Sequence, residues 1–183
     1  MAATGALIAG LPLGASSRTT GRTISEGEFM LLHNLMGAMT PLHVNKHYMQ
    51  TRPYGERILG GGILIGLVAA SFPSSDLYRR LVSDYGMRWI GGLGLEGNFL
   101  APFYPGDTLY GVHNIDHIRV SKSHPDKAIM FVGMKGEKQD GVVCCTGTLR
   151  AMFDRPELAG VLRGHRIQHR ERLPEAIVQA REC

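Results

Sequence analysis

The sequence predicts an α+β domain in which a long antiparallel sheet wraps around one buried apolar helix. Three observations lead to this fold class. The first half of the chain contains two helical segments, and the second of them is apolar on every side. The second half, residues 95–153, reads as strands separated by turn signals. The last strand has one apolar and one polar face, which is typical of antiparallel sheets packed on a core.

The segment TISEGEFMLLHNLMG predicts the first helix, of about ten residues. Ser25 can cap its start, and Glu28, three residues later, completes a capping box. Gly37 is expected to end the helix. The apolar residues that recur at helical spacing are Phe29, Leu32, Leu35 and Met36.

Three consecutive glycines, Gly60 to Gly62, open the second helical segment. The residues that follow are uniformly apolar and rich in alanine, which favours a fully buried helix over a strand. A glycine-rich entrance leaves backbone N–H groups free at the positive end of that helix. Such groups can receive an anion or a polarised carbonyl oxygen.

The strands of the second half are parted by turns at residues 105–107, 124–127 and 139–141. Strict alternation along one strand would place Asp116 on the face opposite to His113 and His117. We expect residues 1–153 to form a single domain, followed by an arginine-rich basic C-terminal tail over residues 154–183. A short helix over residues 174–181 is expected within that tail.

Composition excludes several classes of protein. The 183 residues suit one domain, and 44% hydrophobic with 20% charged residues is typical of a folded globular chain. The formal charge of +4 comes without a basic and aromatic strand pattern, so we expect no nucleic-acid partner. The apolar stretch ALIAGLPLG is broken by glycine and proline, so neither a signal peptide nor a membrane helix is expected.

Cysteine usage indicates a reducing compartment. Cys144 and Cys145 are neighbours in a predicted strand, so their side chains point to opposite faces, and Cys183 leaves an odd total. This pattern argues against a disulfide framework or a metal site, and predicts a cytoplasmic protein. No metal is expected at the histidines either, since no cysteine or carboxylate cluster accompanies them.

The stretch HNLMGAMTPLHVNKHY, residues 33–48, gathers three histidines around a Thr-Pro dipeptide. Four further motifs surround it: RTISE before the first helix, ERI before the glycines, F..P.YPGDTL from Phe99 to Leu109, and SKSHPD. Together these motifs resemble the MaoC-like dehydratases, which are (R)-specific enoyl-thioester hydratases of the hot-dog fold. The similarity covers about residues 11–153.

The resemblance implies a hot-dog fold, an acyl thioester of coenzyme A or of a carrier protein as substrate, no cofactor, and a homodimer or larger homo-oligomer. The family's motif has an Asp, an Asn before a proline, and a His five residues after the Asp. Here Ala38 stands at the Asp position and Thr40 at the Asn position, whereas Pro41 and His43 match. The family's His-Gly pair at the helix entrance falls on Gly60 and Gly61.

By resemblance, His43 is the expected catalytic base, and Gly61 donates its N–H to the thioester oxygen, with Gly62 and Pro41 also touching substrate. The missing carboxylate at residue 38 is expected to cost on the order of 10² to 10⁴ in rate. Four replacements remain open. They are Thr40, His33, His47 and a group on the substrate itself.

The resemblance and the missing carboxylate are compatible with three functions. The first is a lyase that adds water to, or removes it from, the β-carbon of an acyl thioester. The second is an acyl thioesterase on the same scaffold, which would aim water at the carbonyl carbon. The third is a non-catalytic partner subunit that completes the acyl tunnel of an active hydratase.

Overall fold

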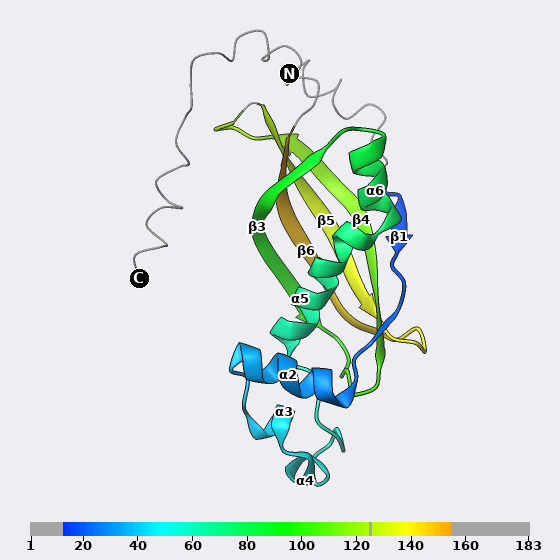
Figure 1. Cartoon of the computed structure of the whole chain (residues 1–183), viewed down its shortest axis with the longest axis vertical. Helices are drawn as coiled ribbons and strands as arrows, with labels where there is room; N and C mark the ends of the chain where they lie inside the picture. Colours follow the sequence, from blue (N-terminus) through cyan, green and yellow to red (C-terminus); the bar gives the residue numbers. More distant parts are fainter. Residues whose placement is uncertain (1–12, 125, 155–183) are drawn as a thin grey trace.

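The computed structural model describes residues 13–124 and 126–154, and these residues form one six-stranded antiparallel sheet with helices packed on one face (Figure 1). The strand order is β1-β4-β5-β6-β3, and β2 pairs with β4 beside β1. The strands are β1 (Ser16–Arg18), β2 (Arg22–Thr23), β3 (Arg88–Phe99), β4 (Thr108–Val120), β5 (Lys127–Glu137) and β6 (Val143–Asp154). The predicted turns fall between the long strands, so the α+β class is confirmed.

The helices follow the chain from the first short strands to β3. They are α2 (Glu26–Met36), α3 (Pro41–Val44), α4 (Lys46–Met49), α5 (Gly61–Ser71), the 3₁₀ helix η1 (Phe72–Ser74) and α6 (Asp76–Ser83). Figure 1 shows the sheet curving around α5, with α2 lying across the end of α5 where that helix begins.

The first predicted helix is confirmed as α2. The hydroxyl of Ser25 accepts a hydrogen bond from the Glu28 N–H at 3.3 Å, and Gly37 ends the helix with a φ of 65°. A positive φ is cheap only for glycine, which explains why the helix stops there. The carboxylate of Glu28 pairs with Arg22, so only half of the expected capping box forms.

The predicted apolar stripe of α2 is wrong in part. Phe29 is fully buried, but Leu35 is 75% exposed and Met36 is 65% exposed. The buried face instead includes His33, which follows Phe29 by one helical turn and is also fully buried. The prediction considered only apolar residues, and therefore placed the buried face of the helix on the wrong side of this histidine.

The second predicted helix is confirmed as α5. Ile63, Leu64, Ile65 and Val68 are buried against the sheet. The helix is not buried on every side, since Gly62 and Ala70 are exposed. The sheet comes unusually close at Gly97 and Gly147, where an added Cβ would lie 2.8 Å and 3.0 Å from the Ile65 Cδ1 atom. Glycines in β3 and β6 therefore set the depth at which α5 sits.

A β-bulge in β4 changes which way two predicted side chains point. Ile115 pairs with Val132 and His117 with Phe131, so Asp116 is an extra residue in the ladder. His113 is consequently buried, whereas Asp116 and His117 are both exposed. The expectation that His117 shares a face with His113 is wrong, because the bulge interrupts the alternation.

Helix α6 was not predicted, although its sequence contains a helix signal. The hydroxyl of Ser75 accepts the Tyr78 N–H at 3.1 Å, and Leu77 and Leu81 are buried one turn apart. The cap followed by this spacing is an ordinary helix signal.

At the other end of the described chain, Asp154 is the last residue of β6. The remaining residues of the predicted tail, with its expected helix and Cys183, lie outside the described residues. Cys144 and Cys145 are buried free thiols. In the part of the chain that the structure describes, no helix combines the length and apolar character needed to cross a membrane.

Candidate active site

The candidate site lies at the start of α5, where α2, α3 and the segment of residues 57–60 meet. This 57–60 segment leads directly into α5, and its backbone is held on several sides. The Leu59 N–H donates to the Phe103 carbonyl at 2.8 Å, and the Ile58 N–H donates to the Leu42 carbonyl at 3.4 Å. The segment therefore ties α3 and the loop after β3 to the first turn of α5.

The imidazole of His43 is oriented by the 57–60 segment. Its Nδ1 lies 2.7 Å from the carbonyl oxygen of Ile58. Since a carbonyl only accepts, Nδ1 carries the proton and donates it. In the neutral ring, Nε2 then carries a lone pair, and this atom lies 3.7 Å from the place that a Cβ on Gly60 would take. The unprotonated nitrogen of a neutral His43 thus lies close to Gly60, the residue before α5.

The first N–H groups of α5 belong to the residues that directly follow Gly60. Within residues 13–124 and 126–154, no hydrogen bond is recorded for the N–H of Gly61 or of Gly62. Both groups stand at the positive end of an eleven-residue helix. The ring of Phe99 covers Gly61, because a Cβ added there would lie 2.6 Å from that ring. Glycine is therefore the residue that fits between the helix start and this ring.

His33 lies next to His43 and is held by the backbone on both nitrogens. Its Nδ1 donates to the Phe29 carbonyl at 2.7 Å, and its Nε2 accepts the Gly60 N–H at 3.0 Å. The two imidazole rings stack with centroids 4.8 Å apart and planes at 22°. Because neither nitrogen is left for a substrate, the geometry speaks against the expected acid–base role of His33 and gives it a structural role.

The environment of His33 keeps that ring neutral. Burial is the largest influence and lowers the pKa of His33, and the charges of His43 and Arg57 act in the same direction. The hydrogen bond to the Phe29 carbonyl works against them. A neutral ring is what the contact with Gly60 requires, since a protonated Nε2 could not accept a hydrogen bond.

This lowered pKa predicts a loss of stability in mild acid. The unfolded chain takes up a proton at His33 near its ordinary pKa of 6.5, whereas the folded chain resists it. The stabilising contribution is therefore full above about pH 6.5 and is lost as the pH falls below that value. We expect the free energy of unfolding, measured by urea titration at successive pH values, to depend less on pH in His33→Gln. His113, whose pKa burial also lowers, and the carboxyl groups with lowered pKa values, such as Glu56 and Asp107, contribute the slope that remains in this variant. An unchanged slope would contradict the assignment, and the exposed His47→Gln serves as the matched control.

The other predicted site residues lie around this centre with fewer contacts. Thr40 precedes α3 and is exposed, and its carbonyl accepts the His43 N–H at 2.9 Å. Pro41 is the first residue of α3, and His47 is exposed on α4. Ala38 lies half-buried in the connection between α2 and α3.

Among the described residues, no three His, Cys, Asp or Glu side chains group in a way that could hold a metal.

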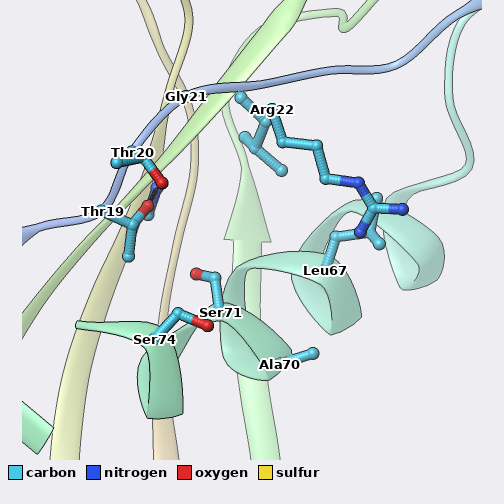
Figure 2. A pocket seen from close by; sticks show the side chains of 10 residues that line it. Thr19, Thr20, Gly21, Arg22, Leu67, Ala70, Ser71 and Ser74 are labelled. Carbon is cyan, nitrogen blue, oxygen red and sulfur yellow. Dashed lines mark hydrogen bonds between the residues drawn. The ribbon is translucent and has the colours of Figure 1, made fainter. Parts of the chain in front are cut away.

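A separate pocket of about 220 Å³ opens at the far end of α5, between that helix, β4 and the connection from β1 to β2. Figure 2 shows hydroxyl groups of Thr19 and Thr20 on the connection and of Ser71 and Ser74 on the helical side. The Ser71 hydroxyl already donates to the Val68 carbonyl at 2.7 Å. Arg22, also in the lining, is paired with Glu28. The pocket does not include His43, so it lies apart from the candidate site.

No family model and no curated protein matches this chain by sequence. Solved structures do match it. A MaoC-like dehydratase from Rhodospirillum rubrum superposes with a TM-score of 0.63 and 20% identity, over 81% of this chain and 96% of that one. The (R)-hydratase from A. caviae involved in PHA biosynthesis gives 0.58 and 20% identity, over 80% and 98%. The HadBC (3R-hydroxyacyl-ACP dehydratase) complex from Mycobacterium tuberculosis gives 0.62 and 13% identity, over 77% and 96%.

These matches confirm the predicted hot-dog fold. At such identities the likeness is one of fold, and the predicted resemblance to MaoC-like dehydratases is confirmed at that level. Two features of the site were not visible in the sequence pattern: the Ile58 carbonyl that orients His43, and the Phe99 ring over Gly61. In the sequence, only the ERI motif before the glycines, which contains Ile58, pointed to the position of this carbonyl.

Proposed function

We propose that this chain is a MaoC-like hydratase or dehydratase, which adds water to, or removes water from, the β-carbon of an acyl thioester. One observation carries the proposal. His43 holds its proton on Nδ1 against the Ile58 carbonyl, and its Nε2 lies 3.7 Å from the Cβ position of Gly60, the residue directly before α5. A base next to an oxyanion-type donor is the arrangement that addition to an enoyl thioester needs.

In the proposed reaction, the Gly61 N–H and the positive end of α5 hold the thioester oxygen. A water molecule on His43 Nε2 forms the new C–O bond at the β-carbon while its proton passes to Nε2. The electron pair of the double bond moves to the thioester oxygen as an enolate. The imidazolium then returns the proton to the α-carbon, which restores the thioester and the neutral base. Dehydration runs through the same steps in reverse.

This cycle lets one histidine serve as base and then as acid, which is our answer to the missing carboxylate. Ala38 can neither take nor give a proton, so we expect a rate about 10²- to 10⁴-fold below that of an enzyme with two such groups. In the proposal, the hydroxyl of Thr40 orients the water, the Gly62 N–H is a second donor to the oxygen, and Pro41 fixes the start of α3 beside the substrate. The acyl group is carried on coenzyme A or on a carrier protein, and the free thiols of Cys144 and Cys145 among the described residues support a cytoplasmic location.

A homodimer joined at β3 is part of the proposal. Within residues 13–124 and 126–154, this strand pairs with β6 on one side only and is the last in the strand order, so no described strand pairs with its other edge. Exposed apolar side chains run along it and just beyond: Ile90, Leu93, Leu95, Phe99 and Leu100. An open edge of this kind is usually covered in the working protein. A monomeric mass in sedimentation equilibrium at micromolar concentration would contradict the dimer.

The absence of a carboxylate at residue 38 also favours a second candidate, a non-catalytic partner subunit of an active hydratase. Such a subunit would keep the fold while losing part of the dyad. It would show no turnover alone and a gain in rate only after a second chain is added.

The test is a hydration assay of the purified chain with crotonyl-CoA, followed by the loss of enoyl absorbance and, in parallel, by a thiol reagent. We expect slow hydration without release of free coenzyme A. Release of free thiol in step with turnover would indicate a thioesterase instead. No turnover by either readout would contradict the lyase proposal and leave the partner subunit.

A further inference from the structure

Side chains on one face of α2 contact the 57–60 segment, which orients His43. Glu26, Phe29, Met30 and His33 recur at helical spacing and all lie on the side of α2 that faces the 57–60 segment. His33 holds the end of the segment through the Gly60 N–H at 3.0 Å. The start of the segment is held by the side chain of Arg57, which reaches back to α2.

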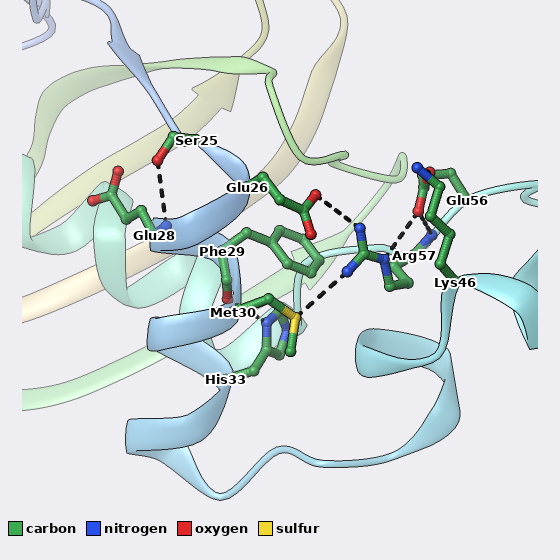
Figure 3. A network of polar contacts seen from close by, with 9 residues as sticks. All are labelled: Ser25, Glu26, Glu28, Phe29, Met30, His33, Lys46, Glu56 and Arg57. Carbon is green, nitrogen blue, oxygen red and sulfur yellow. Dashed lines mark hydrogen bonds and ion pairs between the residues drawn. The ribbon is translucent and has the colours of Figure 1, made fainter.

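Arg57 is a buried cation with contacts on every side. Its side chain donates to the Glu26 carboxylate at 2.8 Å and to the Glu56 carboxylate at 3.0 Å. A third guanidinium contact reaches the sulfur of Met30 at 3.5 Å, and the ring of Phe29 lies 5.6 Å below the guanidinium. Figure 3 shows Arg57 between the two carboxylates, with Lys46 beside Glu56. The residue is 5% exposed, although Glu26 itself lies at the surface.

The charges around Arg57 make this anchor hard to replace. Burial works against its charge, but the bonds to Glu26 and Glu56 outweigh it and raise the pKa of Arg57. The same contacts, led by the hydrogen bond from the Arg57 backbone N–H, lower the pKa of Glu56. Without the guanidinium, the Glu26 and Glu56 carboxylates would lose their shared partner, and the start of the 57–60 segment would lose its tie to α2.

The position of Arg57 affects the next residue, Ile58, whose carbonyl orients His43. The Ile58 carbonyl, which accepts the proton of His43 Nδ1 at 2.7 Å, directly follows Arg57. We propose that Arg57 is a positioning residue for His43, because it holds this carbonyl where it fixes the imidazole tautomer and turns Nε2 toward α5. The structural part of the proposal stands on these contacts alone, whereas its effect on rate rests on the proposed function.

The test measures the tautomer of His43 directly, by ¹⁵N chemical shifts of the histidine side chains in the ¹⁵N-labelled full chain at pH 8. In the wild type we expect His43 to show a protonated Nδ1 and a bare Nε2. In Arg57→Met we expect the opposite tautomer to become populated, and kcat for crotonyl-CoA hydration to fall by up to about 100-fold with little change in KM. Arg57→Lys keeps the charge but not the contact with both carboxylates. Its tautomer population and its kcat should therefore lie between those of the wild type and of Arg57→Met.

Two further variants separate positioning from stability. Leu81→Ala removes a buried side chain of α6 far from the site, so it should lower the melting temperature and leave the His43 tautomer unchanged. Glu26→Gln, at an exposed position, should shift the tautomer in the same direction as Arg57→Met even where the latter folds poorly. A wild-type tautomer in both Arg57→Lys and Glu26→Gln would overturn the proposal. An inactive wild type with the expected tautomer shifts would instead overturn only the proposed function.

Discussion

Replacing His43 with glutamine is expected to lower kcat for crotonyl-CoA hydration by about 10²- to 10⁴-fold. The reason is that, of the two imidazole nitrogens that lie near Gly60, only Nε2 of His43 has no hydrogen bond within the described residues. Its neighbour His33 has both nitrogens bonded to the backbone, so it cannot take over the proton. The measurement is the initial rate of loss of enoyl absorbance at saturating substrate.

The matched control is His47→Gln, which alters an exposed histidine four residues further along the chain. This variant should keep the wild-type rate, which would also remove His47 as the replacement for the missing carboxylate. Wild-type turnover in His43→Gln would show that the base has been assigned to the wrong residue. A fall in the hydration rate of both variants would indicate that the two histidines act together.

Removing the Gly61 N–H is expected to lower kcat by about 10²- to 10³-fold, the usual cost of losing one oxyanion donor. Proline can do this with little change to the backbone, because Gly61 is the first residue of α5, where proline is common in helices. Gly60 already has a φ of −57° and a ψ of 131°, a conformation that suits a residue before proline. The obstacle is the Phe99 ring, 2.6 Å from the Cβ position.

The substitution is therefore made as Gly61→Pro in a Phe99→Ala background, which removes the ring. Gly61→Ala in the same background is the control, because it adds a Cβ but keeps the N–H. We expect the alanine variant to turn over crotonyl-CoA at least about ten times faster than the proline variant. Equal rates in the two would mean that the thioester oxygen is not held at Gly61.

Much of the fold could be predicted from local pattern. The cap at Ser25 and the stop at Gly37 bound α2 correctly, since both depend on chemistry within a few residues. The long strands were predicted by the turn signals between them. The bulge at Asp116 could not be predicted this way, because an extra residue becomes visible only when the register with β5 is known.

The site was predictable only where its chemistry is carried by side chains in a motif. His43 and Gly61 could be named from the resemblance. The partner of His43 could not, because it is the backbone carbonyl of Ile58, and any residue type supplies a carbonyl. For His33 the sequence was misleading. A histidine near the motif suggests an acid–base role, yet both of its nitrogens form hydrogen bonds with the backbone of Phe29 and Gly60.

In the proposed reaction, His43 and the Gly61 N–H act together on one thioester. The most direct measurement is a crystal structure of the slow His43→Gln variant with crotonyl-CoA bound. We expect the thioester oxygen within hydrogen-bonding distance of the Gly61 nitrogen, and the β-carbon facing the side chain at residue 43. A thioester bound elsewhere, or bound with its carbonyl carbon rather than its β-carbon facing residue 43, would contradict it.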